Sequence, residues 1–191
     1  MGTRGTLRVY VDGELKIRQY NQWDSYPTGQ FAMLCDFLSD EKNVMALYGV
    51  LKHTKFFTKD EVDQITKNEW WKRDQPGVSP YYAADFYFLT NRDWGAKILP
   101  MLCMMPTRFY QDNMPDGTSC RVKIADWADV FDETDLDPEE GNYVVTMRRQ
   151  TDGDIDVTIS GEWHDVSRSY GCIPENYMEE ANEWEDQAKE E

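Results

Sequence analysis

The segment that decides the fold is residues 6–29, TLRVYVDGELKIRQYNQWDSYPTG. Apolar residues alternate with others over residues 7–11, and this two-residue period predicts a strand. Asp12-Gly13 follows directly and favours a tight hairpin turn, because glycine tolerates the positive φ that such a turn needs. The chain therefore opens with a hairpin whose second strand covers residues 15–20 and places three residues on one face: Leu15, Ile17 and Gln19.

Helical patterns and a second hairpin follow. Apolar spacing predicts helices over residues 30–39 and 44–52, and the capping box at Thr58–Glu61 predicts a helix that continues to about Trp71. Strand patterns over residues 142–149 and 155–161 flank a turn-rich QTDGD. Two hairpins separated by helices predict an α+β fold, in which an antiparallel sheet has helices packed on one face.

The length of 191 residues indicates one domain, which we place at residues 1–173. Residues 174–191 are predicted to form an acidic C-terminal helix or tail. On a helix, four of these residues would make an apolar stripe: Tyr177, Met178, Ala181 and Trp184.

Net charge is the strongest feature of the composition. The chain has 20 basic and 36 acidic side chains, which gives −16. Direct binding to DNA or RNA is disfavoured, because phosphate neutralisation needs clustered Lys and Arg. A strongly acidic surface instead suits a basic protein partner, or competition with nucleic acid for a basic groove. No apolar run approaches the roughly 18–20 residues of a membrane helix, so no membrane partner is expected.

The four cysteines, Cys35, Cys103, Cys120 and Cys172, form no C-x-x-C pair. Neither His53 nor His164 is spaced to complete a zinc site. We therefore expect reduced thiols and a cytoplasmic location, with no metal and no cofactor. The sequence also lacks the nucleotide-binding and nucleophile motifs of common enzymes, so no catalytic residue is assigned.

The loop after the first hairpin is a candidate ligand site, because loops on rigid hairpins often carry function. Its residues would be Arg4, Tyr20, Asn21, Asp24 and Tyr26. The alternative is that the loop is scaffold. In that case Asp24 caps backbone amides, Pro27 fixes the turn, and Trp23 and Tyr26 fill the core.

Met1-Gly2-Thr3-Arg4-Gly5, a hairpin, and then the Tyr20–Gly29 segment make a joint pattern. It resembles a group of uncharacterised small proteins of phages, bacteria and some fungi. These begin Met-Gly/Ser-Thr-Arg-Gly/Ala and continue to Tyr-Asn-His/Gln-Phe/Trp-Asp-Ser/Gly-Tyr-Pro. The resemblance covers about residues 1–38, and Gly95-Ala96-Lys97-Ile98-Leu99 is weakly similar. It implies a shared fold and a phage or mobile-element accessory protein, and it transfers no catalytic residue.

Two acidic tracts are the candidate partner-binding residues. Asp126 to Glu140 holds eight carboxylates and no basic residue, and residues 174–191 hold eight carboxylates and one lysine. Such runs are usually solvated faces, but they are also able to imitate a phosphate array. The assigned residues are Asp126, Asp129, Asp132, Glu133, Asp135, Asp137, Glu139, Glu140 and Trp184.

The sequence thus predicts a non-enzymatic acidic binding protein that acts as a nucleic-acid mimic. It would be an accessory protein of a phage or mobile element, and it would inhibit a host nucleic-acid-handling defence complex by occupying a basic surface. The alternative is a protein that binds or sequesters a nucleotide, or an unrecognised hydrolase, using the N-terminal loop.

Overall fold

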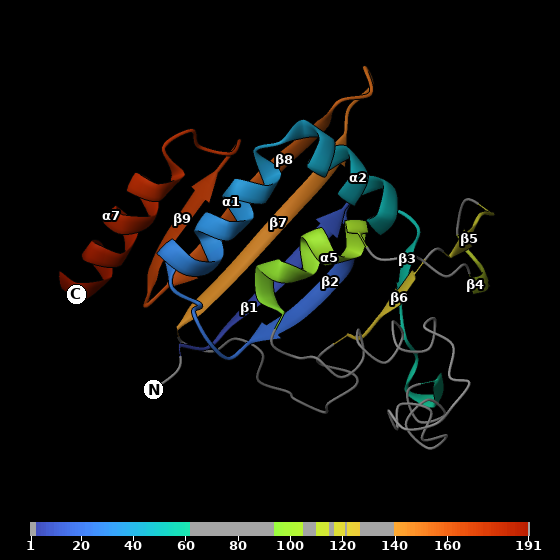
Figure 1. Cartoon of the computed structure of the whole chain (residues 1–191), viewed down its shortest axis with the longest axis horizontal. Helices are drawn as coiled ribbons and strands as arrows, with labels where there is room; N and C mark the ends of the chain where they lie inside the picture. Colours follow the sequence, from blue (N-terminus) through green and yellow to red (C-terminus); the bar gives the residue numbers. More distant parts are fainter. Residues whose placement is uncertain are drawn as a thin grey trace.

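A computed structural model of the chain describes residues 3–61, 94–104, 110–114, 117–120, 122–126 and 140–190. Its centre is a five-stranded sheet in the order β2-β1-β7-β8-β9 (Figure 1). The strands are β1 (Gly5–Val11), β2 (Glu14–Asn21), β7 (Gly141–Arg149), β8 (Ile155–Trp163) and β9 (Val166–Tyr170).

Both predicted hairpins are confirmed, as β1–β2 and β7–β8. They are joined by a parallel pair, in which Gly5 lies opposite Gly141 and Val11 opposite Met147. The sheet is therefore mostly antiparallel but mixed, because its two halves meet through β1 and β7. The predicted face of β2 is wrong for Leu15, because a bulge at Lys16 shifts the register of the strand. Ile17 pairs with Val9, whereas Leu15 pairs with Tyr10 and so lies on the other face.

β9 was not predicted from the sequence. It follows β8 through a two-residue turn, His164-Asp165, in which both residues have positive φ, 45° and 66°. Such a turn matches the twist of an antiparallel pair, but it usually contains glycine or asparagine. His164 and Asp165 give no such signal, so the sequence predicts no strand after residues 155–161.

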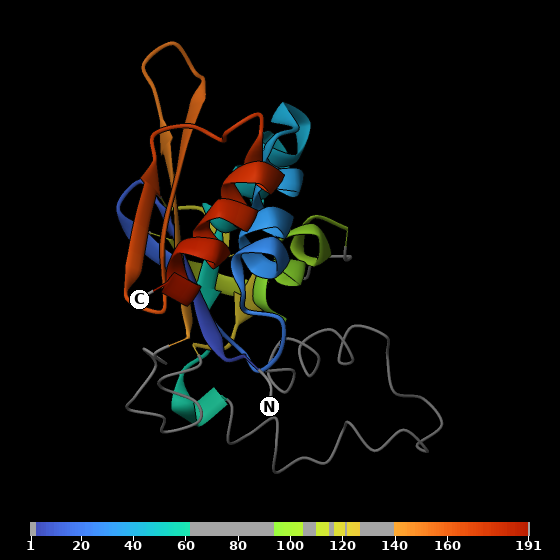
Figure 2. The ribbon, with the colours of Figure 1, turned by 90° about the vertical axis from the view of Figure 1, so that its left-hand side faces the viewer.

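The helices cover one face of the sheet, as predicted (Figures 1 and 2). The predicted helix over residues 30–39 is present as the π-helical turn η1 (Pro27–Phe31) followed by α1 (Ala32–Leu38). Next come α2 (Glu41–Leu51), the 3₁₀ turn η2 (Gly95–Lys97), α5 (Ile98–Met104) and α7 (Tyr177–Glu190). None of the helices in the described ranges is long and apolar enough to cross a membrane.

Two small ladders lie beside the main sheet. They join β3 (Thr54–Phe56) with β6 (Val122–Ile124), and β4 (Tyr110–Asn113) with β5 (Ser119–Cys120). The capping box is formed, because the Glu61 carboxylate accepts from the Thr58 backbone amide at 2.9 Å. The predicted continuation of this helix to about Trp71 lies outside the described residues.

Trp184 closes the core from α7. Its side chain is 0 % exposed, and its Nε1 donates to the Val166 carbonyl at 2.8 Å. Its ring packs edge-on against Phe31 and Tyr143, at centroid distances of 5.5 and 6.0 Å. Gly161 makes room for it, because a Cβ there would lie 2.9 Å from the indole. The predicted apolar stripe is correct for Ala181 and Trp184, but Met178 is exposed.

Asp12 connects three parts of the fold at the first turn. Its carboxylate accepts from the Tyr48 hydroxyl of α2 at 2.6 Å and from the Arg149 amide at the end of β7 at 3.1 Å. Partial burial acts to raise the pKa of Asp12, but these hydrogen bonds and nearby cations outweigh it and lower the pKa below 3.8. The ionised carboxylate is therefore the form that stabilises the fold.

We expect Trp184→Ala to lower the free energy of unfolding by about 3–5 kcal/mol, because it removes a large buried side chain and leaves a cavity. Met178→Ala on the same helix is the matched control, since Met178 is 47 % exposed, and should change stability by less than about 0.5 kcal/mol. Urea unfolding followed by circular dichroism measures both. Equal effects of the two variants would contradict this account of the core.

We also expect Asp12→Asn to be less stable than wild type at about pH 7, and this difference to shrink as the pH falls. Because the folded-state pKa is lowered, the contribution of Asp12 is complete above 3.8 and is lost as the pH drops through its folded value. Asparagine tolerates the positive φ of residue 12, so the turn is preserved. Denaturant unfolding of both proteins at several pH values measures the difference, and a constant difference would contradict the assignment.

Candidate functional site

The loop after β2 passes over the end of the sheet at which the strands β1 and β7 begin. Gly5 and Gly141 lie side by side there, and Ser25 packs on both. A Cβ on Gly5 would come within 2.7 Å of the Ser25 Cβ. The Tyr143 hydroxyl donates to the Ser25 carbonyl at 2.7 Å. The contacts with Gly5, Gly141 and Tyr143 therefore hold the loop against the sheet.

The polar side chains of the loop bond mostly to the loop itself. The buried Asn21 amide donates to the Trp23 carbonyl and to the Ser25 hydroxyl, the latter at 2.9 Å. The Tyr26 hydroxyl donates to Asp24 at 3.2 Å. Burial, together with the Asp24 charge, raises the pKa of Tyr26. Asp24 has φ 58°, so the turn itself places this carboxylate beside Tyr26.

The five residues assigned to a small-molecule site do not gather at one point. Asn21 lies opposite Gly5 on the helical face of the sheet, whereas Tyr20 lies opposite Thr6 and faces the other way. Arg4 is exposed at the start of the chain, and its backbone amide donates to Glu140. This arrangement favours the scaffold interpretation of the loop. Its expectation that Trp23 fills the core is wrong, because Trp23 is 58 % exposed.

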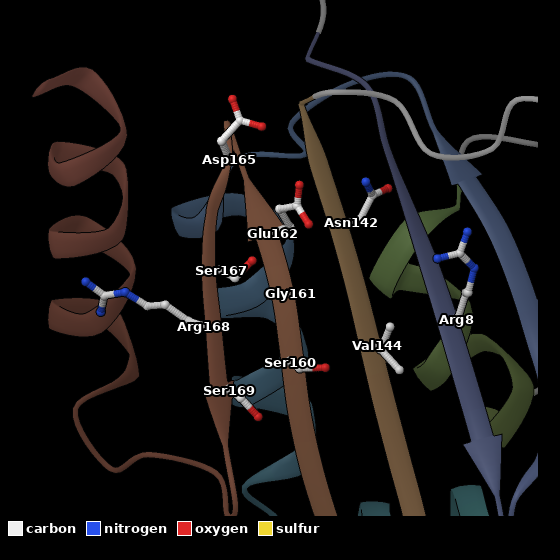
Figure 3. A pocket seen from close by; sticks show the side chains of 10 residues that line it. All are labelled: Arg8, Asn142, Val144, Ser160, Gly161, Glu162, Asp165, Ser167, Arg168 and Ser169. Carbon is white, nitrogen blue, oxygen red and sulfur yellow. The ribbon is translucent and has the colours of Figure 1, made fainter. Parts of the chain in front are cut away.

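The sheet face opposite the helices carries a shallow depression of about 680 Å³ (Figure 3). Small polar side chains line its centre, and Glu162 and Asp165 lie at one end. β7 separates Glu162 on β8 from Arg8 on β1, and the Arg168 side chain turns away towards α7. The depression therefore has the character of a contact surface, without a converging acid and base.

The first acidic tract is described only at its two ends. Asp126 is 5 % exposed and pairs with Arg18 at 3.4 Å, so its carboxylate is used inside the fold. Glu140 accepts from the Arg4 amide. The other assigned residues of this tract lie outside the described residues: Asp129, Asp132, Glu133, Asp135, Asp137 and Glu139.

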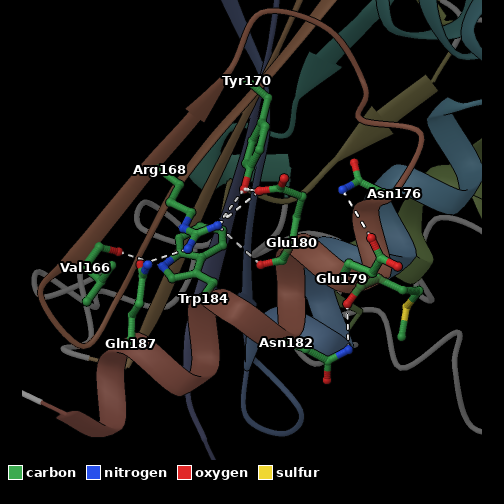
Figure 4. Close-up of polar contacts among 10 residues, drawn as sticks. Val166, Arg168, Tyr170, Asn176, Glu179, Glu180, Asn182, Trp184 and Gln187 are labelled. Carbon is green, nitrogen blue, oxygen red and sulfur yellow. Dashed lines mark hydrogen bonds and ion pairs between the residues drawn. The ribbon is translucent and has the colours of Figure 1, made fainter.

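The second tract forms α7, where four carboxylates have partners (Figure 4). Glu179 accepts from the Asn176 side-chain amide at 3.5 Å. Glu180 accepts from Arg168 and from the Tyr170 hydroxyl, each at 3.0 Å. Glu185 accepts from the Thr28 amide at 2.7 Å and so holds α7 against η1. Asp186 pairs with Lys189 at 2.9 Å. Trp184, which was assigned to partner binding, lies in the core and does not reach the surface.

Glu179 and the remaining carboxylates of this region face solvent. Glu175, Glu179 and Glu183 follow each other at intervals of four residues, and Asp36 joins them because it accepts from the Tyr177 hydroxyl at 3.1 Å. Glu41 and Asp156 line a groove together with Glu175. We call five of these exposed residues the acidic surface: Asp36, Glu41, Glu175, Glu179 and Glu183. Asp156 is left out because it alternates with the buried Val157, so its carboxylate lies on the opposite face of the sheet. None of the five forms an ion pair within the described part of the chain.

Sequence reasoning missed Asp36 and Glu41, because each is isolated from the acidic tracts along the chain. The packing of α7 beside α1 brings Asp36 to the tract, and the groove between α2 and the start of α7 brings Glu41 to it. Glu175, Glu179 and Glu183 were counted in the second tract but not singled out. For Glu179 and Glu183 the spacing of four residues was the available signal, since it puts side chains on the same side of a helix, whereas Glu175 lies in the turn before α7.

Among the described residues, no group of three or more His, Cys, Asp or Glu is arranged to hold a metal ion. The His53 ring hydrogen-bonds to Thr118 at 3.0 Å, and the His164 ring packs against Trp163 in the β8–β9 turn. Cys35 is buried in the core, and this burial raises the pKa of its thiol to about 12, so it stays protonated.

The comparisons with known proteins return no match: no family model, no curated protein and no solved structure is similar to this chain.

We expect Asn21→Ala to lower the free energy of unfolding by about 1–3 kcal/mol, because it leaves buried polar partners unsatisfied. Trp23→Ala in the same loop is the control, since Trp23 is 58 % exposed, and should change stability by less than about 0.5 kcal/mol. The two variants, like wild type, should show no change in melting temperature with any nucleotide of a panel. A nucleotide shift in wild type that Asn21→Ala abolishes would instead establish the loop as a ligand site.

Proposed function

We propose that this protein is a non-enzymatic binding protein whose acidic surface occupies a basic surface on a protein partner. The partner is a host protein that handles nucleic acid, as in a defence complex, and the acidic surface competes there with the phosphate backbone. The protein is an accessory protein of a phage or mobile element.

The observation that carries this proposal is the division of α7 into two sides. Ala181 and Trp184 are buried on the inner side, so the outer carboxylates are held in fixed positions on a packed helix. Glu179 and Glu183 lie one turn apart, and like charges at this spacing repel each other. This repulsion slightly destabilises the folded protein, and a bound basic partner would neutralise it.

The remaining support comes from charge and from the N-terminal pattern. The net charge of −16 gives a field that draws a basic partner over a distance and repels nucleic acid itself. Such attraction between exposed charges weakens as salt shortens the screening length. The phage or mobile-element origin rests on the resemblance of residues 1–38 to the group described above.

The test is retention of bacterial nucleic-acid-binding proteins on the immobilised chain. We expect a specific partner to bind at about 0.05 M salt, to elute by about 0.5 M salt, and to be displaced by duplex DNA. Glu179→Gln with Glu183→Gln should weaken this retention strongly.

The matched control is Asp60→Asn with Glu162→Gln, two exposed carboxylates outside the acidic surface. Each double variant changes the net charge from −16 to −14, since two negative charges are removed. A partner that both double variants lose equally would indicate a general charge effect. That result, or the absence of any specific partner at either salt concentration, would overturn the proposal.

A further inference from the structure

A groove of about 590 Å³ lies where the N-terminal end of α7 approaches α1, α2 and β8. Its walls come from the end of α1, the first turn of α2, the start of β8 and the β9–α7 connection. This volume is within the range of pockets that hold a ligand of several functional groups.

The floor of the groove is apolar. Buried or half-buried side chains from four elements form it: Leu38, Val44, Ile155, Val157, Ile173 and Tyr177. Burial of one such surface patch against a partner side chain removes it from water and favours binding.

The rim of the groove is acidic. Glu41 and Glu175 are exposed beside the apolar floor, and none of the described residues that line the groove is Lys or Arg. Asp156 also lines the groove, but it alternates with the buried Val157 on β8, so its carboxylate lies on the opposite face of the sheet, where it accepts from the Gln150 amide. The other polar side chains among the described lining residues are Ser39, Cys172 and the Tyr177 hydroxyl, and none of these is basic.

The walls are fixed before any partner arrives. The Asp40 side chain caps α2 by accepting from the Lys42 amide at 2.8 Å, next to Glu41. The Tyr177 hydroxyl donates to Asp36 at 3.1 Å and so ties the start of α7 to α1. A groove formed in advance loses little conformational entropy when it binds.

We propose that this groove binds a short basic segment of the protein partner, in which arginine or lysine alternates with an apolar side chain. The inference deepens the proposed function and rests on it, because the groove belongs to the acidic surface.

The chemistry of the groove selects this occupant. An apolar side chain of the segment covers the floor, and the aliphatic stems of arginine or lysine extend the same contact. Their charged ends then reach the carboxylates of the rim, where guanidinium groups pair well with two oxygens. A purely apolar segment would leave the carboxylates unpaired, and a nucleic acid would place phosphates against them.

Two labelled peptides of equal charge test the groove directly, one alternating arginine with leucine and the other arginine with glycine. We expect the arginine–leucine peptide to bind at least about tenfold more tightly at low salt, because burial of a leucine side chain gives at least that factor. Fluorescence anisotropy measures both affinities. Equal affinities would overturn the groove while leaving the proposed function standing, and no binding of either peptide would overturn both.

Paired variants locate the site. Glu41→Gln with Glu175→Gln should weaken the arginine–leucine peptide more than Glu179→Gln with Glu183→Gln, although both double variants remove two charges. Thermal unfolding of each variant checks that the fold is intact. Equal weakening by the two pairs would overturn the groove as the site.

Cys172 gives an independent readout, because it lines the groove and its thiol is exposed. The rate of Cys172 alkylation by iodoacetamide, followed by peptide mapping, should fall at least about fivefold with saturating arginine–leucine peptide, since the reagent needs access to the thiolate. The arginine–glycine peptide at the same concentration should protect less. An unchanged rate with the arginine–leucine peptide bound would overturn the proposal.

Discussion

Ser25 packs against the bare backbones of Gly5 and Gly141, and this contact fixes where the sheet and the helical layer meet. Any side chain at either glycine would displace the loop, and the Tyr143 hydroxyl holds the loop from inside. The chain enters η1 directly from this point, so Phe31 reaches Trp184, and the Gln30 side chain accepts from the Ala96 amide at 2.6 Å. The first and last helical segments are thus positioned by one close approach between two strands.

Much of this fold is local and could therefore be predicted from the sequence. Asp12-Gly13 specifies its turn by backbone conformation alone, with φ 51° and 87°, and the helical spacing of α1 and α2 is equally local. The parallel pairing of β1 with β7 depends on residues 136 apart, as between Gly5 and Gly141, and no short pattern encodes it. β9 was missed for a different reason, since the residues of its turn adopt a conformation that they usually avoid.

The candidate site is likewise only partly predictable from the sequence. Charge is visible in a sequence, but its availability is not: Asp126 and Trp184 belong to the predicted tracts and are buried, whereas Asp36 and Glu41 lie outside them and are exposed. The loop residue Asn21 has a polar side chain that would suit a ligand. Its hydrogen bonds to Trp23 and Ser25 depend on the position of the loop, which Gly141 and Tyr143 fix, and so they could not be predicted from the local sequence.

The position of Trp184 near the end of the chain has a consequence for folding. The core receives the Trp184 side chain from α7, and the central strand pair joins residues that lie 136 positions apart, as in Gly5 and Gly141. Contacts between distant parts of a chain slow folding, because a long loop must close before they form. The nascent chain thus has its hairpins and early helices before it has a completed core. Until α7 is synthesised, Phe31 and Tyr143 lack their contact with Trp184, and this part of the aromatic surface is open to chaperones or to aggregation.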